Sequence, residues 1–91
     1  MRVEATNQSL KFLEKIEDKL KERIRLKIRK LALAIDNDGI IPFKELSIKK
    51  LDGSWKGYYR MIVGKVRIIF IYDKEQNVLF INEIDFRGNI Y

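Results

Sequence analysis

The sequence predicts an α+β fold in which an N-terminal helical hairpin packs on an antiparallel β-sheet, within a single domain over residues 1–91. In residues 9–35, apolar side chains recur every three or four positions, which is the period of a helix with one buried face. Residues 58–85 are instead rich in the aromatic and β-branched side chains typical of strands. The single proline, Pro42, follows residues 36–39, whose acidic, amide and glycine side chains end a helix. This segment therefore divides a helical half from a strand-rich half.

The helical half is longer than a usual globular helix, so we expect two antiparallel helices with a break near residues 17–19. One long helix is the alternative, because no glycine or proline marks the break. Residues 2–5 are expected to form a short edge strand, and Thr6 or Asn7 to cap the first helix by accepting a backbone hydrogen bond. The predicted buried stripe consists of Leu10, Leu13, Ile16, Leu20, Ile24, Ile28, Leu31 and Ile35.

The strand-rich half is predicted to form an antiparallel meander from residues 58–63, 66–72 and 78–85. Residues 47–51 and the N-terminal strand are expected to extend it. Gly64 and Lys65 fit a two-residue type II′ turn, because its first central position requires a positive φ. This turn sets the cross-strand pairs Val63–Val66, Met61–Ile68 and Tyr59–Phe70. The same register, continued through a polar loop at residues 73–77, places Glu83 opposite Arg67.

The predicted register gives the sheet two different faces. The face expected to carry the helices is apolar and consists of Tyr59, Met61, Val63, Val66, Ile68, Phe70, Val78, Phe80 and Ile84. The other face is mixed: Arg60 lies diagonal to Arg67, and Glu83, Asp85 and Arg87 follow along the neighbouring strand. Apolar side chains are expected beside these charges, namely Ile62, Ile69, Ile71, Leu79 and Ile81. A salt-bridge ladder would explain part of this face, but three arginines against two acids leave a positive surplus that suits phosphate.

The net charge and the absence of two residue types limit the partners and the kinds of site that this chain can have. The 19 Lys and Arg residues against 13 Asp and Glu residues give a net charge of +6, which favours a polyanion such as nucleic acid as partner. The absence of cysteine and histidine excludes a disulfide framework, a zinc finger, a thiol nucleophile and any histidine acid or base. The longest apolar runs, residues 31–35 and 68–72, are too short to span a membrane, and no signal peptide is visible. We therefore expect a cytoplasmic protein without a membrane partner.

Four short motifs occur in order along the C-terminal half of the chain. They are Leu51-Asp52-Gly53, Tyr59-Arg60-Met61, Gly64-Lys65-Val66-Arg67-Ile68-Ile69-Phe70 and Phe86-Arg87-Gly88-Asn89-Ile90-Tyr91. Their order and spacing resemble those of the RelE/ParE superfamily of toxins from type II toxin–antitoxin systems. The helical segment and the short first strand resemble that family in outline.

The resemblance to RelE-like members implies a helical hairpin on a twisted antiparallel β-sheet with a concave basic face. It further implies a ribosome-dependent mRNA endonuclease (an mRNA interferase) that inhibits translation and needs no metal and no small-molecule cofactor. The implied catalytic residues are Arg67, Arg87, Tyr91 and Glu45, and the implied RNA-binding residues are Arg60, Lys56, Lys65 and Lys49. The implied partners are a cognate antitoxin protein, the ribosome and mRNA.

Two other functions stay open at this point. A ParE-like inhibitor of DNA gyrase without nuclease activity fits the lack of histidine and the acid Asp85, which stands where some active nucleases carry a basic residue. A plain RNA-binding module is the third possibility, with bases stacked on Trp55, Tyr58, Tyr59 or Tyr72.

Overall fold

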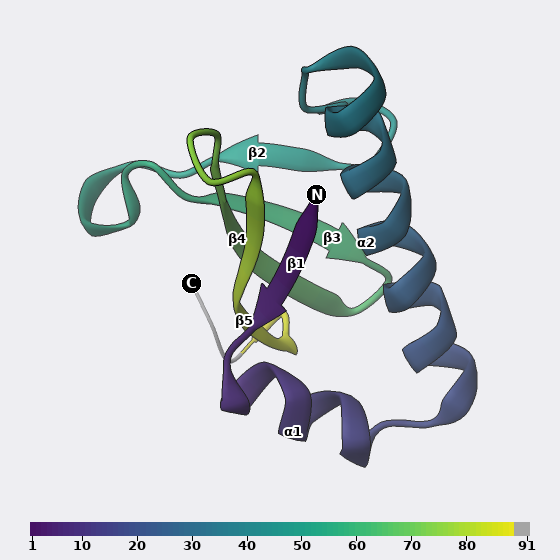
Figure 1. Cartoon of the computed structure of the whole chain (residues 1–91). Coiled ribbons are helices and arrows are strands. Elements are labelled where there is room, and N and C mark those ends of the chain that lie inside the picture. The colour runs from purple at the N-terminus through teal and green to yellow at the C-terminus, as the bar shows by residue number, and fades with distance from the viewer. Residues whose placement is uncertain (89–91) are drawn as a thin grey trace.

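The computed structural model describes residues 1–88 and shows two helices and one five-stranded sheet in that part of the chain (Figure 1). The elements are β1 (Arg2–Ala5), α1 (Asn7–Lys15), α2 (Asp18–Asp38), β2 (Ile48–Lys50), the short 3-10 helix η1 (Gly53–Trp55), β3 (Tyr59–Val63), β4 (Val66–Asp73) and β5 (Val78–Phe86). The predicted α+β class is confirmed, including both additional strands. The sheet has the order β1-β5-β4-β3-β2 and is mixed, because β1 pairs parallel to β5 while every other pair is antiparallel.

The helical segment breaks where it was expected to break. Ile16 takes an extended conformation with φ −94° and ψ 162°, which ends α1, and α2 begins two residues later. At its other end, α2 stops at Gly39, which adopts φ 69° and donates its N–H to the Ile35 carbonyl at 2.9 Å. Glycine suits this left-handed position because it has no Cβ to clash. The single-helix alternative is wrong.

Thr6 caps α1 and ties it to the sheet. Its Oγ1 accepts a hydrogen bond from the Ser9 N–H at 3.2 Å and donates to the Asn82 carbonyl at 2.9 Å. One hydroxyl therefore satisfies a free donor at the helix start and a carbonyl of β5.

Replacement of Thr6 by alanine is expected to lower the free energy of unfolding by about 1–2 kcal/mol, because both partners of the hydroxyl lose a hydrogen bond. Urea unfolding followed by circular dichroism measures this change. Thr6→Ser is the control, since it keeps the hydroxyl and should lose much less stability. Equal losses in both variants would contradict a capping role.

The β3–β4 hairpin has the predicted register. Gly64 has φ 58°, as a type II′ turn requires at its first central position, and the three predicted pairs are present. Arg60 is consequently paired with Ile69, and Arg67 with Ile62. This pairing places Arg60 diagonal to Arg67.

The predicted register of β5 is wrong. Asp73 pairs with Val78, so the loop contains only residues 74–77 and the register shifts by one residue. The shorter loop is held by the Gln76 N–H, which donates to Asp73 Oδ1 at 3.1 Å, and by the positive φ of 55° at Asn77. A one-residue shift exchanges the two faces of a strand.

The exchange of faces is confined to the first part of β5. Leu79 and Ile81 lie in the core, contrary to prediction, and Val78 and Phe80 lie on the opposite face. A register irregularity after Phe70, which pairs with Ile81 while Ile69 pairs with Glu83, then restores the predicted faces. Because the two shifts add, Asp85 and not Glu83 lies opposite Arg67.

The core lies between the helices and one face of the sheet. The stripe of α2 that it buries consists of Leu20, Ile24, Leu31 and Ile35. The sheet side consists of Ile48, Met61, Val63, Val66, Ile68, Phe70, Leu79, Ile81 and Ile84. Leu10 was predicted to join the stripe but is 48% exposed, whereas Leu13, Ile16 and Ile28 pack against the core. Within residues 1–88, neither helix has a stretch long and apolar enough to cross a membrane.

Candidate functional site

The open face, as we call the sheet face opposite the helices, carries most of the predicted site. Residues on alternate positions of the central strands point to it because side chains alternate along a strand. Its charged residues on β2 to β5 are Lys49, Arg60, Arg67, Asp73, Glu83 and Asp85. Its apolar residues are Ile62, Ile69, Ile71, Val78 and Phe80. Val78 and Phe80 take the places that were predicted for Leu79 and Ile81, which lie in the core, and Ile69 is fully buried on this face.

Three predicted cationic residues come together on the open face. Lys49 of β2 is directly opposite Arg60 of β3, and directly opposed Cβ atoms are about 4.5–5.5 Å apart. Arg60 lies diagonal to Arg67 of β4, which corresponds to about 7–8 Å. Arg60 and Arg67 are both half-buried, so their guanidinium groups are supported by the sheet surface. This row can bind the phosphates of an extended polyanion.

An acid faces this row at one point. Asp85 of β5 is directly opposite Arg67, and Glu83 is opposite Ile69. The carboxylate of Asp85 is therefore placed to hold Arg67 and to offset part of its charge. The surplus of positive charge is greatest toward the β2 edge of the sheet.

Two other predicted residues meet at the end of the sheet. Lys65 lies in the β3–β4 turn, and its carbonyl accepts a hydrogen bond from the Arg87 N–H at 2.9 Å. The Lys65 Nζ also lies 5.9 Å from the centre of the Phe86 ring, within cation–π range. Arg87 follows Asp85 by two residues, about 7 Å along the chain. Tyr91 lies outside the described residues.

Glu45 and Lys56 are not part of the cationic row. Glu45 is exposed in the turn before β2. β2 is an edge strand of the sheet and lies two strands, or about 10 Å, from β4. Lys56 is exposed in the loop after η1, which projects from the β2 and β3 ends of the sheet (Figure 1). The half-buried Trp55 of η1 packs edge-on against Tyr58, with ring centres 5.4 Å apart.

A groove of about 540 Å³ at the β2 edge contains two residues that the sequence analysis missed. It is lined by Phe43, Lys44, Ser47, Ile48, Lys49 and Arg60. The residues missed are Phe43 and Lys44, which precede β2 in a segment without helical or strand periodicity. An exposed aromatic residue followed by a lysine, just after Pro42, was the available signal.

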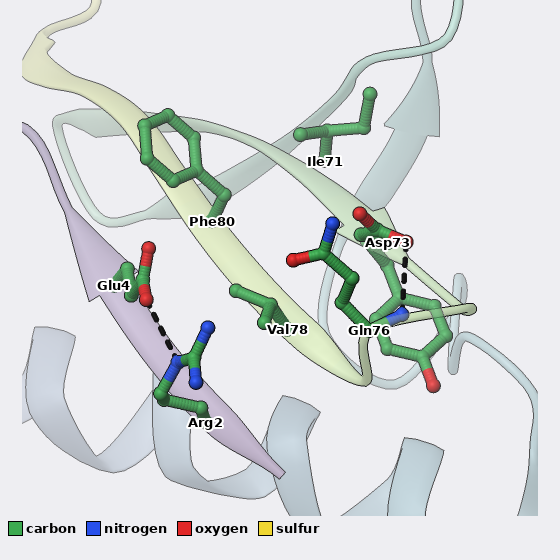
Figure 2. Close-up of a pocket in the computed structure, with 8 residues that line it drawn as sticks. Arg2, Glu4, Ile71, Asp73, Gln76, Val78 and Phe80 are labelled. Carbon is green, nitrogen blue, oxygen red and sulfur yellow. Dashed lines mark hydrogen bonds and ion pairs between the residues drawn. The ribbon is translucent and has the colours of Figure 1, made fainter.

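A second hollow of about 360 Å³ lies at the far end of the open face, near the β4–β5 loop. Figure 2 shows Arg2 and Glu4 on β1 beside Val78 and Phe80 of the neighbouring strand β5, with the Arg2 Nε donating to Glu4 Oε2 at 2.7 Å. These two charges neutralise each other. No predicted site residue lines this hollow, so it is separate from the cationic row.

The acidic side chains do not form a metal site in the part of the chain that the structure describes. Across residues 1–88, no three of them are grouped so as to hold a metal ion. The charged groups around the cationic row are those of arginine and lysine, with the carboxylates of Glu83 and Asp85 on the neighbouring strand β5.

Solved structures with similar folds are toxins of toxin–antitoxin systems. The archaeal RelE–RelB complex from Pyrococcus horikoshii has a TM-score of 0.72 and 24% identity, over 98% of this chain and 97% of that chain. The RelB–RelE complex from Methanococcus jannaschii has a TM-score of 0.73 and 24% identity, over 97% and 94% of the two chains. The YoeB/ParE toxin from Agrobacterium tumefaciens has a TM-score of 0.74 and 21% identity, over 96% and 99%. At these identities the likeness shows the shared fold.

The sequence itself shows the family. No curated protein sequence matches the chain. A family model described as the ParE toxin of the type II toxin–antitoxin system parDE matches residues 3–91, which is nearly the whole chain. The predicted membership of the RelE/ParE superfamily is thus confirmed, and the chain belongs to the ParE toxin family of type II toxin–antitoxin systems.

Proposed function

We propose that this toxin acts in the cytoplasm as a ribosome-dependent, metal-independent mRNA endonuclease that stops translation. The observation that carries the proposal is the row of Lys49, Arg60 and Arg67 on adjacent strands of the open face. Such a row suits a single RNA strand lying across the sheet, because guanidinium groups bind phosphate oxygens through two parallel hydrogen bonds.

The reaction that fits these residues uses the RNA as its own nucleophile. The 2′-OH next to the scissile phosphate attacks phosphorus, the bond to the 5′-oxygen breaks, and a 2′,3′-cyclic phosphate and a 5′-OH result. The phosphorane gains negative charge in the transition state, so a cation fixed beside it accelerates the step. One group must also take the 2′-OH proton and another must protonate the 5′-oxygen.

We propose that Arg67, on the central strand β4, stabilises the negative charge of the phosphorane. Arg87 is the second catalytic cation, and Arg60, Lys49, Lys65 and Lys56 bind flanking RNA. Glu45 is the proposed general base that takes the 2′-OH proton. Tyr91 is proposed to stack on a nucleobase of the RNA or to join the proton transfer. Glu45 precedes β2, which lies two strands or about 10 Å from β4, so it reaches the reaction only if the ribosome bends the mRNA toward the β2 edge.

Purified toxin incubated with mRNA, with and without ribosomes, tests this proposal. We expect cleavage only in the presence of ribosomes, and products that end in a cyclic phosphate. A parallel assay of DNA gyrase supercoiling should show no inhibition. Intact mRNA together with blocked supercoiling would overturn the proposal.

Inhibition of DNA gyrase without nuclease activity is the second candidate function. Two observations favour it: the matching family is described as ParE, and Asp85 lies directly opposite Arg67. An acid at this place reduces the positive charge available to a phosphorane. The supercoiling assay above distinguishes the two functions.

We also propose a cognate antitoxin as the protein partner. Two of the similar structures are complexes of a toxin with RelB, and the similar YoeB of Staphylococcus aureus was solved with YefM. On this chain, Ile62, Ile71 and Phe80 are half-buried apolar residues on the same open face as the arginines. An antitoxin segment rich in leucine and glutamate would cover both kinds of side chain.

Arg67→Glu is expected to raise the Kd of the antitoxin complex by about 10- to 100-fold, because it places a like charge opposite the antitoxin's acids. Isothermal titration calorimetry with the cognate antitoxin measures the change. Arg29→Glu, on the exposed side of α2, is the matched control and should alter the Kd little. An unchanged Kd for Arg67→Glu would remove the antitoxin from this part of the open face.

A further inference from the structure

The groove at the β2 edge has a rigid aromatic side. Phe43 is 40% exposed, and its ring centre lies 6.0 Å from that of Tyr59. Tyr59 in turn stacks on Phe70 at 5.3 Å and 19°, and Phe70 is fully buried. Phe43 is therefore the outer member of a row of three rings that is anchored in the core.

The backbone around Phe43 is also held in place. The Phe43 N–H donates to the Ile41 carbonyl at 2.9 Å, and the Phe43 carbonyl accepts from the Ile48 N–H at 2.8 Å. Ser47, which lines the groove, has φ 54°, a conformation that few residues other than glycine adopt. A ring fixed in this way loses little conformational entropy when a ligand binds to it.

The rest of the groove lining is cationic. Lys44, Lys49 and Arg60 contribute three positive charges, and no acidic residue lines the groove. Glu45 lies in the same turn but is not part of the lining. A ligand that suits this groove therefore combines negative charge with a flat ring.

We propose that this groove is a nucleotide subsite for single-stranded RNA, in which one unpaired base stacks on Phe43 and its phosphates contact Lys44 and Lys49. A stacked base requires a strand without a pairing partner, which excludes the interior of a duplex. The subsite rests on the proposed action on RNA and extends the cationic row, since Arg60 belongs to both. It places the nucleotide two strands from Arg67, so it holds a nucleotide that flanks the one at the scissile phosphate.

Binding of a short 2′-O-methyl oligoribonucleotide tests the subsite without cleavage, because the nucleophile is blocked. Fluorescence anisotropy should give a Kd about tenfold higher for Phe43→Leu than for the wild type, since the variant loses the stacking of a base on the aromatic ring. Leucine keeps the apolar contact with Tyr59 but removes the ring. Phe43→Tyr keeps the ring and should restore the wild-type Kd, and Leu33→Ala on α2 should leave it unchanged.

Oligonucleotides with one abasic position each locate the stacked base. At one position, loss of the base should lower the affinity of the wild type about tenfold. The same oligonucleotide should bind Phe43→Leu as tightly as the intact oligonucleotide does. Lys44→Ala should lower the slope of log Kd against log salt by about 0.7, as expected for one phosphate contact on a single strand.

The inference is overturned if Phe43→Leu binds RNA like the wild type, or if no abasic position is coupled to Phe43. Loss of antitoxin binding with unchanged RNA binding would assign the groove to the protein partner instead. The proposed function can fail separately. A protein that leaves ribosome-bound mRNA intact, yet binds RNA through Phe43, retains the subsite and loses only the nuclease activity.

Discussion

Arg67→Ala is expected to lower the rate of cleavage of ribosome-bound mRNA by a factor of about 10² to 10³, the usual cost of losing one group that stabilises a charged transition state. Arg67 lies on β4 in the centre of the sheet, half-buried, with Asp85 directly opposite. The sheet surface therefore covers part of its side chain before RNA binds. Single-turnover cleavage with saturating ribosomes measures the chemical step without the contribution of binding.

Two variants separate this role from a general effect of charge. Arg67→Lys keeps the charge but loses the planar fork, so it should recover only part of the rate. Arg29→Ala removes one positive charge from the exposed side of α2, and this variant should cleave like the wild type. If Arg67→Ala also cleaved like the wild type, Arg67 would have no place at the phosphate.

Leu31→Ala is expected to lower the free energy of unfolding by about 2–5 kcal/mol, because it removes a fully buried side chain and leaves a cavity under the sheet. Small domains have a total stability of about 5–15 kcal/mol, so this variant would lose a large share of its stability. The midpoint of urea unfolding, at an unchanged slope, measures the loss.

Leu33→Ala is the matched control on the same helix. Leu33 is 51% exposed, and alanine favours the helix, so the free energy of unfolding should change by no more than about 0.5 kcal/mol. Similar losses in both variants would contradict the packing of α2 on the sheet.

The parts of the fold that were predicted correctly have local causes. The hairpin register follows from Gly64, because glycine at the first central position of a two-residue loop favours a type II′ turn, and that turn aligns both strands. Thr6 could be identified as a cap because its hydroxyl acts three residues along the chain. The buried stripe of α2 follows from its period.

The register of β5 could not be predicted because its causes are less local. Residues 73–77 are all polar and allow more than one loop length. The observed loop depends on a hydrogen bond from the Gln76 backbone N–H to the Asp73 side chain. The later irregularity skips Asn82, whose carbonyl accepts from the distant Thr6 hydroxyl. One residue of error at the loop was sufficient to exchange Leu79 and Phe80 between the two faces.

The same distinction applies to the candidate site. Arg60 and Arg67 were placed correctly because they lie on the hairpin whose register is determined by its turn. Asp85 was misplaced because it lies on β5. Phe43 was missed because it precedes β2 in a turn, where position depends on contacts with Tyr59 across the fold and not on any sequence period.

Primer extension on cellular mRNA after induction of the toxin tests the central claim most directly. Wild-type toxin should produce new, discrete 5′ ends within translated regions, and Arg67→Ala expressed at the same level should produce none. Intact mRNA in cells arrested by the wild type, or the same 5′ ends with Arg67→Ala, would contradict the claim that this toxin cuts mRNA through the open face.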